Sequence, residues 1–158
     1  MTATQFTGDF TAIGTLNGTE AVTKEFDVKS GAAISIQKGD LVIVDGSNAG
    51  YVKKAADGAA NTARWIGIAE SDSDDTASAD GTVQVLFSPS GLLVRGLPTT
   101  AANLTQAIKL TLVTLDVASG VQKVDENDTT NGVLAVYAYN TTDGTIDVVV
   151  PCHLPYVS

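Results

Sequence analysis

The chain has 158 residues, a length that fits one domain with a sizeable core. Only 17% of the residues are charged, and the net charge is −9, mostly from Asp. Such an acidic chain, without a cluster of Lys and Arg, is expected to bind neither nucleic acid nor an anionic membrane, because basic side chains supply most of the affinity for phosphates. The single cysteine, Cys152, excludes a disulfide within the chain.

The N-terminal segment has no basic region followed by an apolar run, so we expect no signal peptide. No stretch approaches the roughly 18 apolar residues of a membrane span. Residues 1–20 are rich in Thr and Gly and have few apolar positions, which predicts an extended N-terminal arm. We expect a single β-rich domain over residues 21–158.

From residue 21 onward, short apolar or alternating runs are closed by Gly or Asp, as is typical of antiparallel strands joined by tight turns. The expected strands cover residues 21–28 (continued over 33–37), 41–44, 51–54, 64–69, 82–87, 92–97, 110–117, 121–124, 133–139 and 145–150. The spacing of about nine or ten strands predicts an all-β fold, a compact barrel or sandwich of short antiparallel strands with at most one short helix.

Two segments interrupt this regular pattern. Gly67 lies inside the strand at residues 64–69, and an interior glycine indicates a bulge or a close backbone approach. Residues 98–107 form the one credible helix, a short one that Thr99 or Thr100 could cap.

Residue types that commonly carry catalysis are scarce. The one histidine, His153, directly follows Cys152, and adjacent residues of a strand point to opposite faces, so we expect no Cys–His pair and no zinc site. No Gly-rich phosphate loop is present. Trp65, the single tryptophan, is expected in the core, which leaves paired carboxylates without the aromatic cleft that glycoside hydrolysis usually needs. The sequence therefore predicts no enzyme and no cofactor.

Two acidic loops are expected, at residues 71–80 and 125–131. Oxygen-rich loops can bind calcium, and the candidates in the first loop are Asp72, Asp74, Asp75 and Asp80. Neither loop has the Gly and Glu spacing of a helix-flanked calcium loop. The favoured interpretation is two solvated loops that keep the surface negative.

Several short motifs follow one another along the chain. Lys38-Gly39-Asp40 leads into the apolar strand at residues 41–44, and further runs lie at residues 50–53, 65–69, 81–85, 114–117 and 144–148. Taken in this order, over about residues 35–150, they resemble the capsid decoration proteins of tailed bacteriophages, which are also called cement or head-stabilising proteins.

The resemblance implies a structural virion protein on the capsid exterior, synthesised in the cytoplasm of the bacterial host. Similar proteins bind the expanded shell as trimers, or sometimes as other small oligomers, at local symmetry axes and clamp neighbouring major capsid subunits. The implied partners are the major capsid protein and further copies of this chain. Apolar side chains on a loose segment are costly unless they dock, so the capsid-contact candidates are Phe6, Phe10, Ile13 and Leu16.

Two further interpretations compete with this one. A carbohydrate-binding or adhesive β-module would need an exposed aromatic platform, for which the candidates are Trp65, Tyr51, Tyr137 and Tyr139. A head-fibre or tail component would form long assemblies instead of discrete oligomers.

Overall fold

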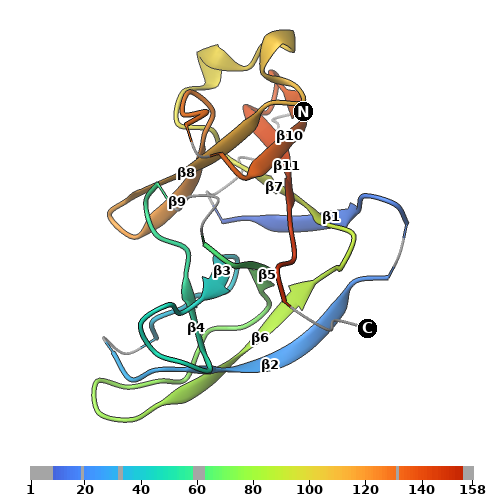
Figure 1. Cartoon of the computed structure of the whole chain (residues 1–158). Coiled ribbons are helices and arrows are strands. Elements are labelled where there is room, and N and C mark those ends of the chain that lie inside the picture. The colour runs from blue at the N-terminus through green and yellow to red at the C-terminus, as the bar shows by residue number, and fades with distance from the viewer. Residues whose placement is uncertain (1–8, 19, 32–33, 59–62, 131, 155–158) are drawn as a thin grey trace.

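The structure is a computed structural model that describes residues 9–18, 20–31, 34–58, 63–130 and 132–154. It consists of a closed five-stranded barrel and a curled six-stranded sheet (Figure 1). In bonded order, the barrel contains β2 (Val22–Val28), β4 (Tyr51–Lys54), β3 (Leu41–Val44), β5 (Trp65–Ala69) and β6 (Gly81–Phe87). The sheet contains β1 (Thr11–Thr15), β7 (Leu92–Gly96), β11 (Thr145–Val150), β10 (Leu134–Asn140), β8 (Leu112–Ala118) and β9 (Val121–Asp125). The predicted all-β fold is confirmed.

Strands β3 and β5 form a wall between two hydrophobic cores. Val42 and Ile66 belong to the core inside the barrel, whereas Leu41 and Trp65 belong to the larger core shared with the sheet. A strand that is buried on both faces needs apolar residues at every position, which accounts for the uninterrupted apolar run of β3.

Gly67 in β5 lies against the backbone of β6. A Cβ atom at this position would lie 2.0 Å from the carbonyl oxygen of Leu86. On the other side of β5, the register with β3 shifts between Val42 and Ile43. The bulge and the close backbone approach predicted from this interior glycine are both confirmed.

Gln122 ties the sheet to the barrel through a buried side-chain amide. Its Oε1 accepts the N–H of Leu41 at 2.7 Å, and its Nε2 donates to the carbonyls of Leu41 and Ala55 at 3.1 and 3.0 Å. The side chain of a β9 residue thus satisfies backbone groups where β3 begins and β4 has just ended. Buried polar groups require such partners, so this amide fixes how the two sheets meet.

The predicted helix at residues 98–107 is wrong. The segment contains two single 3₁₀ turns, η1 (Ala101–Asn103) and η2 (Gln106–Ile108). The N–H of Thr99 bonds to the carbonyl of Val124, and Glu126 accepts the N–H groups of Thr99 and Thr100. The backbone is extended at Thr100, Leu104 and Thr105, so each helical stretch stops after a single turn. No helix in the described parts of the chain is long and apolar enough to span a membrane.

The expected strand at residues 33–37 is also wrong for the residues that the structure describes, 34–37. They form an irregular loop that bonds to the acidic loop opposite: Ile34 donates to the carbonyl of Asp75, and Ile36 exchanges hydrogen bonds with Ser73. Ile34 has a φ of 53°, which is incompatible with a strand.

Part of the expected N-terminal arm belongs to the packed sheet. Thr11–Thr15 form β1, which pairs antiparallel with β7, and the buried ring of Phe10 packs against Gly96. Local composition did not reveal this, because the partner strand lies about 80 residues further along the chain. Residues 1–8 lie outside the described residues.

Candidate docking surface

The outer strand β1 carries two of the four predicted capsid contacts on its surface. Ile13 is 39% exposed and Leu16, just after the strand, is 52% exposed. Phe10 fills the core and is not available to a partner, and Phe6 lies outside the described residues. No charged residue occurs from Phe10 to Gly18, although charged side chains commonly protect an edge strand from pairing. We name Ile13 and Leu16, together with the outer strand β1, the β1 edge.

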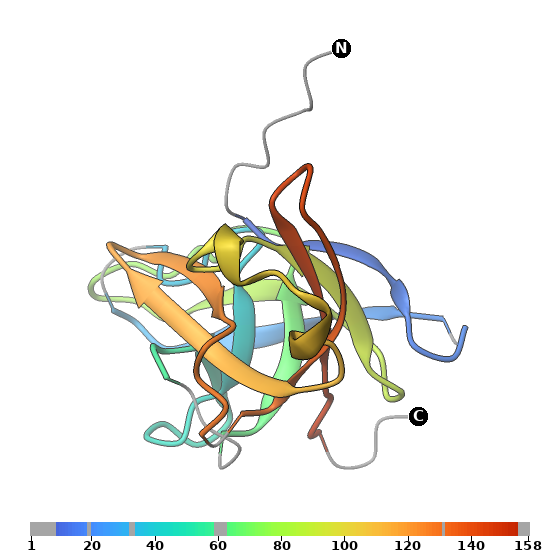
Figure 2. The same ribbon diagram turned by 90° about the horizontal axis from the view of Figure 1, so that it is seen from above.

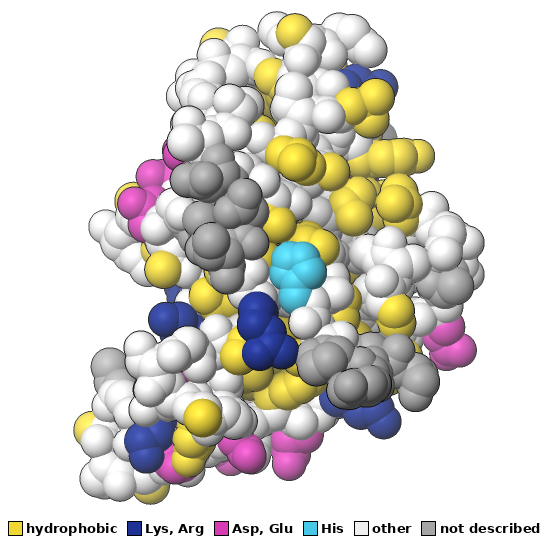
Figure 3. All heavy atoms as spheres, in the orientation of Figure 1, with side chains coloured by type: hydrophobic (Ala, Val, Ile, Leu, Met, Phe, Trp, Pro, Cys, Tyr) yellow, Lys and Arg dark blue, Asp and Glu magenta, His cyan; other side chains and the backbone are white. Residues whose placement is uncertain are grey.

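A second apolar surface lies on the outer face of the same sheet, over β8 and β10. The cross-strand register brings Leu112, Ala135, Val149 and Leu93 into one row on the face turned away from the core. Leu110 and the half-exposed Tyr137 extend this row. In Figure 3, hydrophobic side chains gather at the upper right of the molecule, over the six-stranded sheet, and the acidic side chains of that view lie elsewhere. We name Leu110, Leu112 and Tyr137 the Leu110 surface.

The Leu110 surface was not predicted from the sequence, although a signal for it exists. In the expected strand at residues 110–117, Leu110 and Leu112 alternate with Val113 and Leu115, so strict alternation places both leucines on the solvent side, where a polar residue is expected. In the structure Leu112 begins β8 and Leu110 precedes it. Two leucines on the solvent side of a strand are the pattern that an exposed apolar patch leaves in a sequence.

The first acidic loop is held by hydrogen bonds from the protein itself. Asp72 accepts the N–H of Lys38 at 2.8 Å, and Asp74 accepts the N–H of Thr82 at 2.7 Å. The carboxylate of Asp75 accepts the N–H and hydroxyl of Ser35 and the hydroxyl of Ser73. Within the described ranges, no three His, Cys, Asp or Glu side chains lie where they could share a metal ion. These carboxylates pin the loop to the barrel.

Asp80 at the end of this loop has the clearest electrostatic signature. Its carboxylate accepts the hydroxyl of Tyr51 at 2.7 Å and the N–H of Ser30 at 2.8 Å, and Lys29 lies 3.4 Å away. The Tyr51 hydrogen bond, then the Ser30 bond and Lys29, lower the pKa of Asp80 from 3.8 to about 2. A lowered pKa means that ionised Asp80 stabilises the fold above pH 3.8, and that this contribution is lost as the pH falls towards 2.

We predict that Tyr51→Phe raises the pKa of Asp80 towards 3.8, because the largest cause of the lowered value is removed. An NMR titration of the side-chain carboxyls measures this directly. The melting temperatures of wild type and variant should differ at neutral pH and converge below pH 2. Tyr137→Phe, on the sheet, should leave the titration of Asp80 unchanged. An unaltered pKa in Tyr51→Phe would contradict this assignment.

The second acidic loop contains a buried carboxylate. Glu126 accepts hydrogen bonds from both the N–H and the hydroxyl of Thr99, from the N–H of Thr100 and from the side-chain amide of Asn103. These bonds, at 2.9–3.0 Å, fix the segment that carries the two 3₁₀ turns. Glu126 is thus a structural residue that places the segment leading to Leu110.

The aromatic residues do not assemble a sugar platform in the described chain. Trp65 is fully buried, as predicted, and Tyr139 packs against the same core. The hydroxyl of Tyr51 is engaged with Asp80, which leaves Tyr137 as the exposed aromatic side chain of the proposed set. Cys152 packs against the barrel core, whereas the exposed His153 accepts the N–H of Trp65 through Nδ1 at 3.1 Å.

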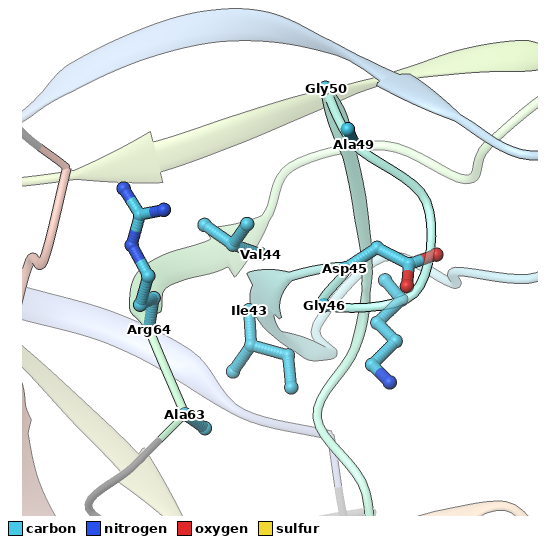
Figure 4. Close-up of a pocket in the computed structure, with 9 residues that line it drawn as sticks. Ile43, Val44, Asp45, Gly46, Ala49, Gly50, Ala63 and Arg64 are labelled. Carbon is cyan, nitrogen blue, oxygen red and sulfur yellow. The ribbon is translucent and has the colours of Figure 1, made fainter.

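A hollow of about 480 Å³ opens beside the β3–β4 hairpin. Ile43 and Val44 form its floor, with Arg64 on one side and Asp45 on the other (Figure 4). The carboxylate of Asp45 accepts hydrogen bonds from the N–H groups of Ser47 and Asn48 and from the side-chain amide of Asn48. The described lining contains no Ser, Thr, Cys or His.

No family model, no curated protein and no solved structure matches this chain.

Proposed function

We propose that this chain is a structural virion protein that binds the outer surface of the expanded capsid of a tailed bacteriophage and clamps neighbouring major capsid subunits. The observation that carries the proposal is the β1 edge: an uncharged outer strand with Ile13 and Leu16 exposed on it. Such an edge can accept an extended segment of a partner by strand addition, with backbone hydrogen bonds for affinity and apolar side chains for specificity.

The rest of the molecule fits this function. The first acidic loop is bonded to the barrel, the second is bonded to the segment between β7 and β8, and strands β3 and β5 contribute to both hydrophobic cores. The folded chain therefore carries its exposed apolar surfaces, the β1 edge and the Leu110 surface, on the six-stranded sheet. The proposal also draws on the motifs that resemble decoration proteins, and it includes synthesis in the host cytoplasm, no catalytic activity, and assembly into a small oligomer, with a trimer expected.

Binding to a repeated shell makes weak contacts sufficient. Each copy needs a modest patch, because a capsid presents the same site many times and an oligomer binds several sites at once. A protein that binds the expanded shell alone stabilises that state by mass action.

The test is co-sedimentation of the purified protein with expanded, undecorated heads, with unexpanded proheads as the control shell. We expect saturable binding to expanded heads only. Leu16→Asp together with Ile13→Asp should weaken binding at least tenfold, because both changes place a charge on the β1 edge. Val121→Asp is the matched control, since Val121 is an exposed apolar residue of β9, the strand at the opposite edge of the sheet from β1.

An N-terminal truncation tests capsid binding only if it leaves the packed sheet intact. Removing residues 1–20 would also remove Phe10 and β1, so loss of binding could follow from unfolding. Removing residues 1–8 leaves the described sheet complete and tests the N-terminal segment alone. The proposal fails if neither shell binds the protein, or if the variant with charges on the β1 edge binds as tightly as wild type.

The adhesive module remains the second candidate, carried by Tyr137 alone. A glycan array separates the two: selective glycan binding that Tyr137→Ala abolishes would favour adhesion.

A further inference from the structure

Leu110 combines two unfavourable features. Its side chain is 83% exposed, more than any other large apolar side chain of the described residues. Its backbone has a φ of 68°, in the left-handed region that Gly, Asn and Asp adopt more readily than leucine. In an isolated chain, a polar residue would serve better on both counts. Such an outlier indicates a function beyond the stability of the single chain.

The neighbouring strands hold Leu110 firmly in this position. Its N–H donates to the carbonyl of Val136 at 2.8 Å, and the N–H of Val136 donates to the carbonyl of Thr111 at 2.9 Å. The hydroxyl of Thr111 also donates to the carbonyl of Ile108 at 2.6 Å. Leu110 therefore projects from a backbone held by hydrogen bonds, so little backbone entropy is lost when its side chain is covered.

A hollow adjoins this projecting leucine. It has a volume of about 390 Å³ and is lined by Gln106, Lys109, Leu110, Tyr137 and Ala138. The ring of Tyr137 and the aliphatic stems of Gln106 and Lys109 can cover an apolar side chain. A protruding leucine and a hollow that can receive one thus occur on the same surface, which is the arrangement that contact between identical copies requires.

The charge of the surface also favours a second copy. The chain carries a net charge of −9, yet the hollow is lined by a lysine and no acidic residue. On the same face of the sheet, Arg95 and Asp147 neutralise each other through hydrogen bonds of 2.8 and 3.1 Å. The lining of the hollow thus places no carboxylate between two acidic copies, and the nearby acidic residue Asp143 lies beside Arg95.

We propose that the Leu110 surface joins copies of this chain, with Leu110 of one copy seated in the hollow beside Tyr137 of the next. A stable interface covers roughly 800 Å² on each partner, so the contact must also extend over Leu112, Gln106 and Lys109. The inference names the contact through which the proposed oligomer forms. It does not depend on capsid binding, because the purified chain should associate without a shell.

Sedimentation equilibrium of the full chain over a wide concentration range tests the proposal. We expect a reversible oligomer in the wild type. Leu110→Asn should weaken association at least 30-fold, as expected for a central interface residue. Asparagine tolerates the left-handed backbone better than leucine, so the monomer should keep or raise its melting temperature. Far-ultraviolet circular dichroism checks that the fold is retained.

Ile34→Asn is the matched control. Ile34 is also an exposed apolar residue, at 47%, with a positive φ of 53°, but it lies in the loop facing Asp75 on the barrel. It should gain thermal stability in the same way and leave association unchanged. A wild type that stays monomeric at several hundred micromolar, or a Leu110→Asn variant that associates like wild type, overturns the inference.

The capsid proposal can fail separately. A monomeric protein that still binds expanded heads through Ile13 and Leu16 would refute the Leu110 contact and leave capsid binding intact. Association that Leu110→Asn abolishes, in a protein that binds no shell, would support the contact and refute the capsid proposal.

Discussion

Replacing Gly67 with alanine is expected to lower the free energy of unfolding by about 3 kcal/mol or more. The new Cβ would lie 2.0 Å from the carbonyl oxygen of Leu86 and 3.0 Å from the Cβ of Phe87. Since Leu86 is paired with Ile68 in the neighbouring strand, its backbone can move away only if the β5–β6 ladder is disrupted. Urea unfolding followed by the fluorescence of Trp65 measures the effect.

Gly46→Ala is the control for this substitution. Gly46 lies in the turn after β3, where an added Cβ would meet nothing within 4 Å. The same chemical change should therefore alter the free energy of unfolding by less than about 0.5 kcal/mol. Equal effects of the two substitutions would show that β5 does not approach β6 as closely as described.

Replacing Phe10 with alanine is expected to cost about 3–5 kcal/mol, the usual range for removing a buried aromatic ring. The ring packs against Gly96, where a Cβ would lie 2.4 Å from it, so Gly96 itself supplies no side chain to fill the space that the ring leaves. The N–H of Phe10 also donates to the carbonyl of Gly39 in the barrel. Phe10 thus joins the start of β1 to both halves of the fold.

Leu16→Ala is the comparison for Phe10→Ala. Leu16 is half exposed and lies just beyond β1, so its truncation should cost less than about 1 kcal/mol. If residues 10–16 formed a loose arm, the two substitutions would have similar, small effects on urea unfolding. A large difference between them is the result expected of a packed strand.

The local sequence was sufficient for most strands and for their type. The hairpins of β3 with β4, β8 with β9, and β10 with β11 follow from alternating or continuous apolar runs separated by short turns. The interior Gly67 was also informative, because a strand tolerates glycine where another backbone comes close. These features depend on neighbours in sequence, and the sequence contains them.

Features that depend on distant partners could not be predicted in this way. β1 was read as part of an arm because its partner, β7, lies far along the chain. The helix expected at residues 98–107 gave way to two single 3₁₀ turns separated by extended residues, and nothing in the local pattern shows that the buried carboxylate of Glu126 binds this segment. The Leu110 surface needed the register between β8 and β10 before its residues could be recognised as neighbours.

The wall formed by β3 and β5 has a mechanical consequence. Because the same short strands line both cores, the barrel and the sheet share their packing and have no flexible hinge at this boundary. The chain also passes between the two units from β1 to β2, from β6 to β7, and after β11 (Figure 1). Seen from above, the orange strands of the sheet lie over the cyan and green strands of the barrel (Figure 2). A force applied to the β1 edge is therefore transmitted to the barrel through the shared packing, and we expect the two units to resist it together.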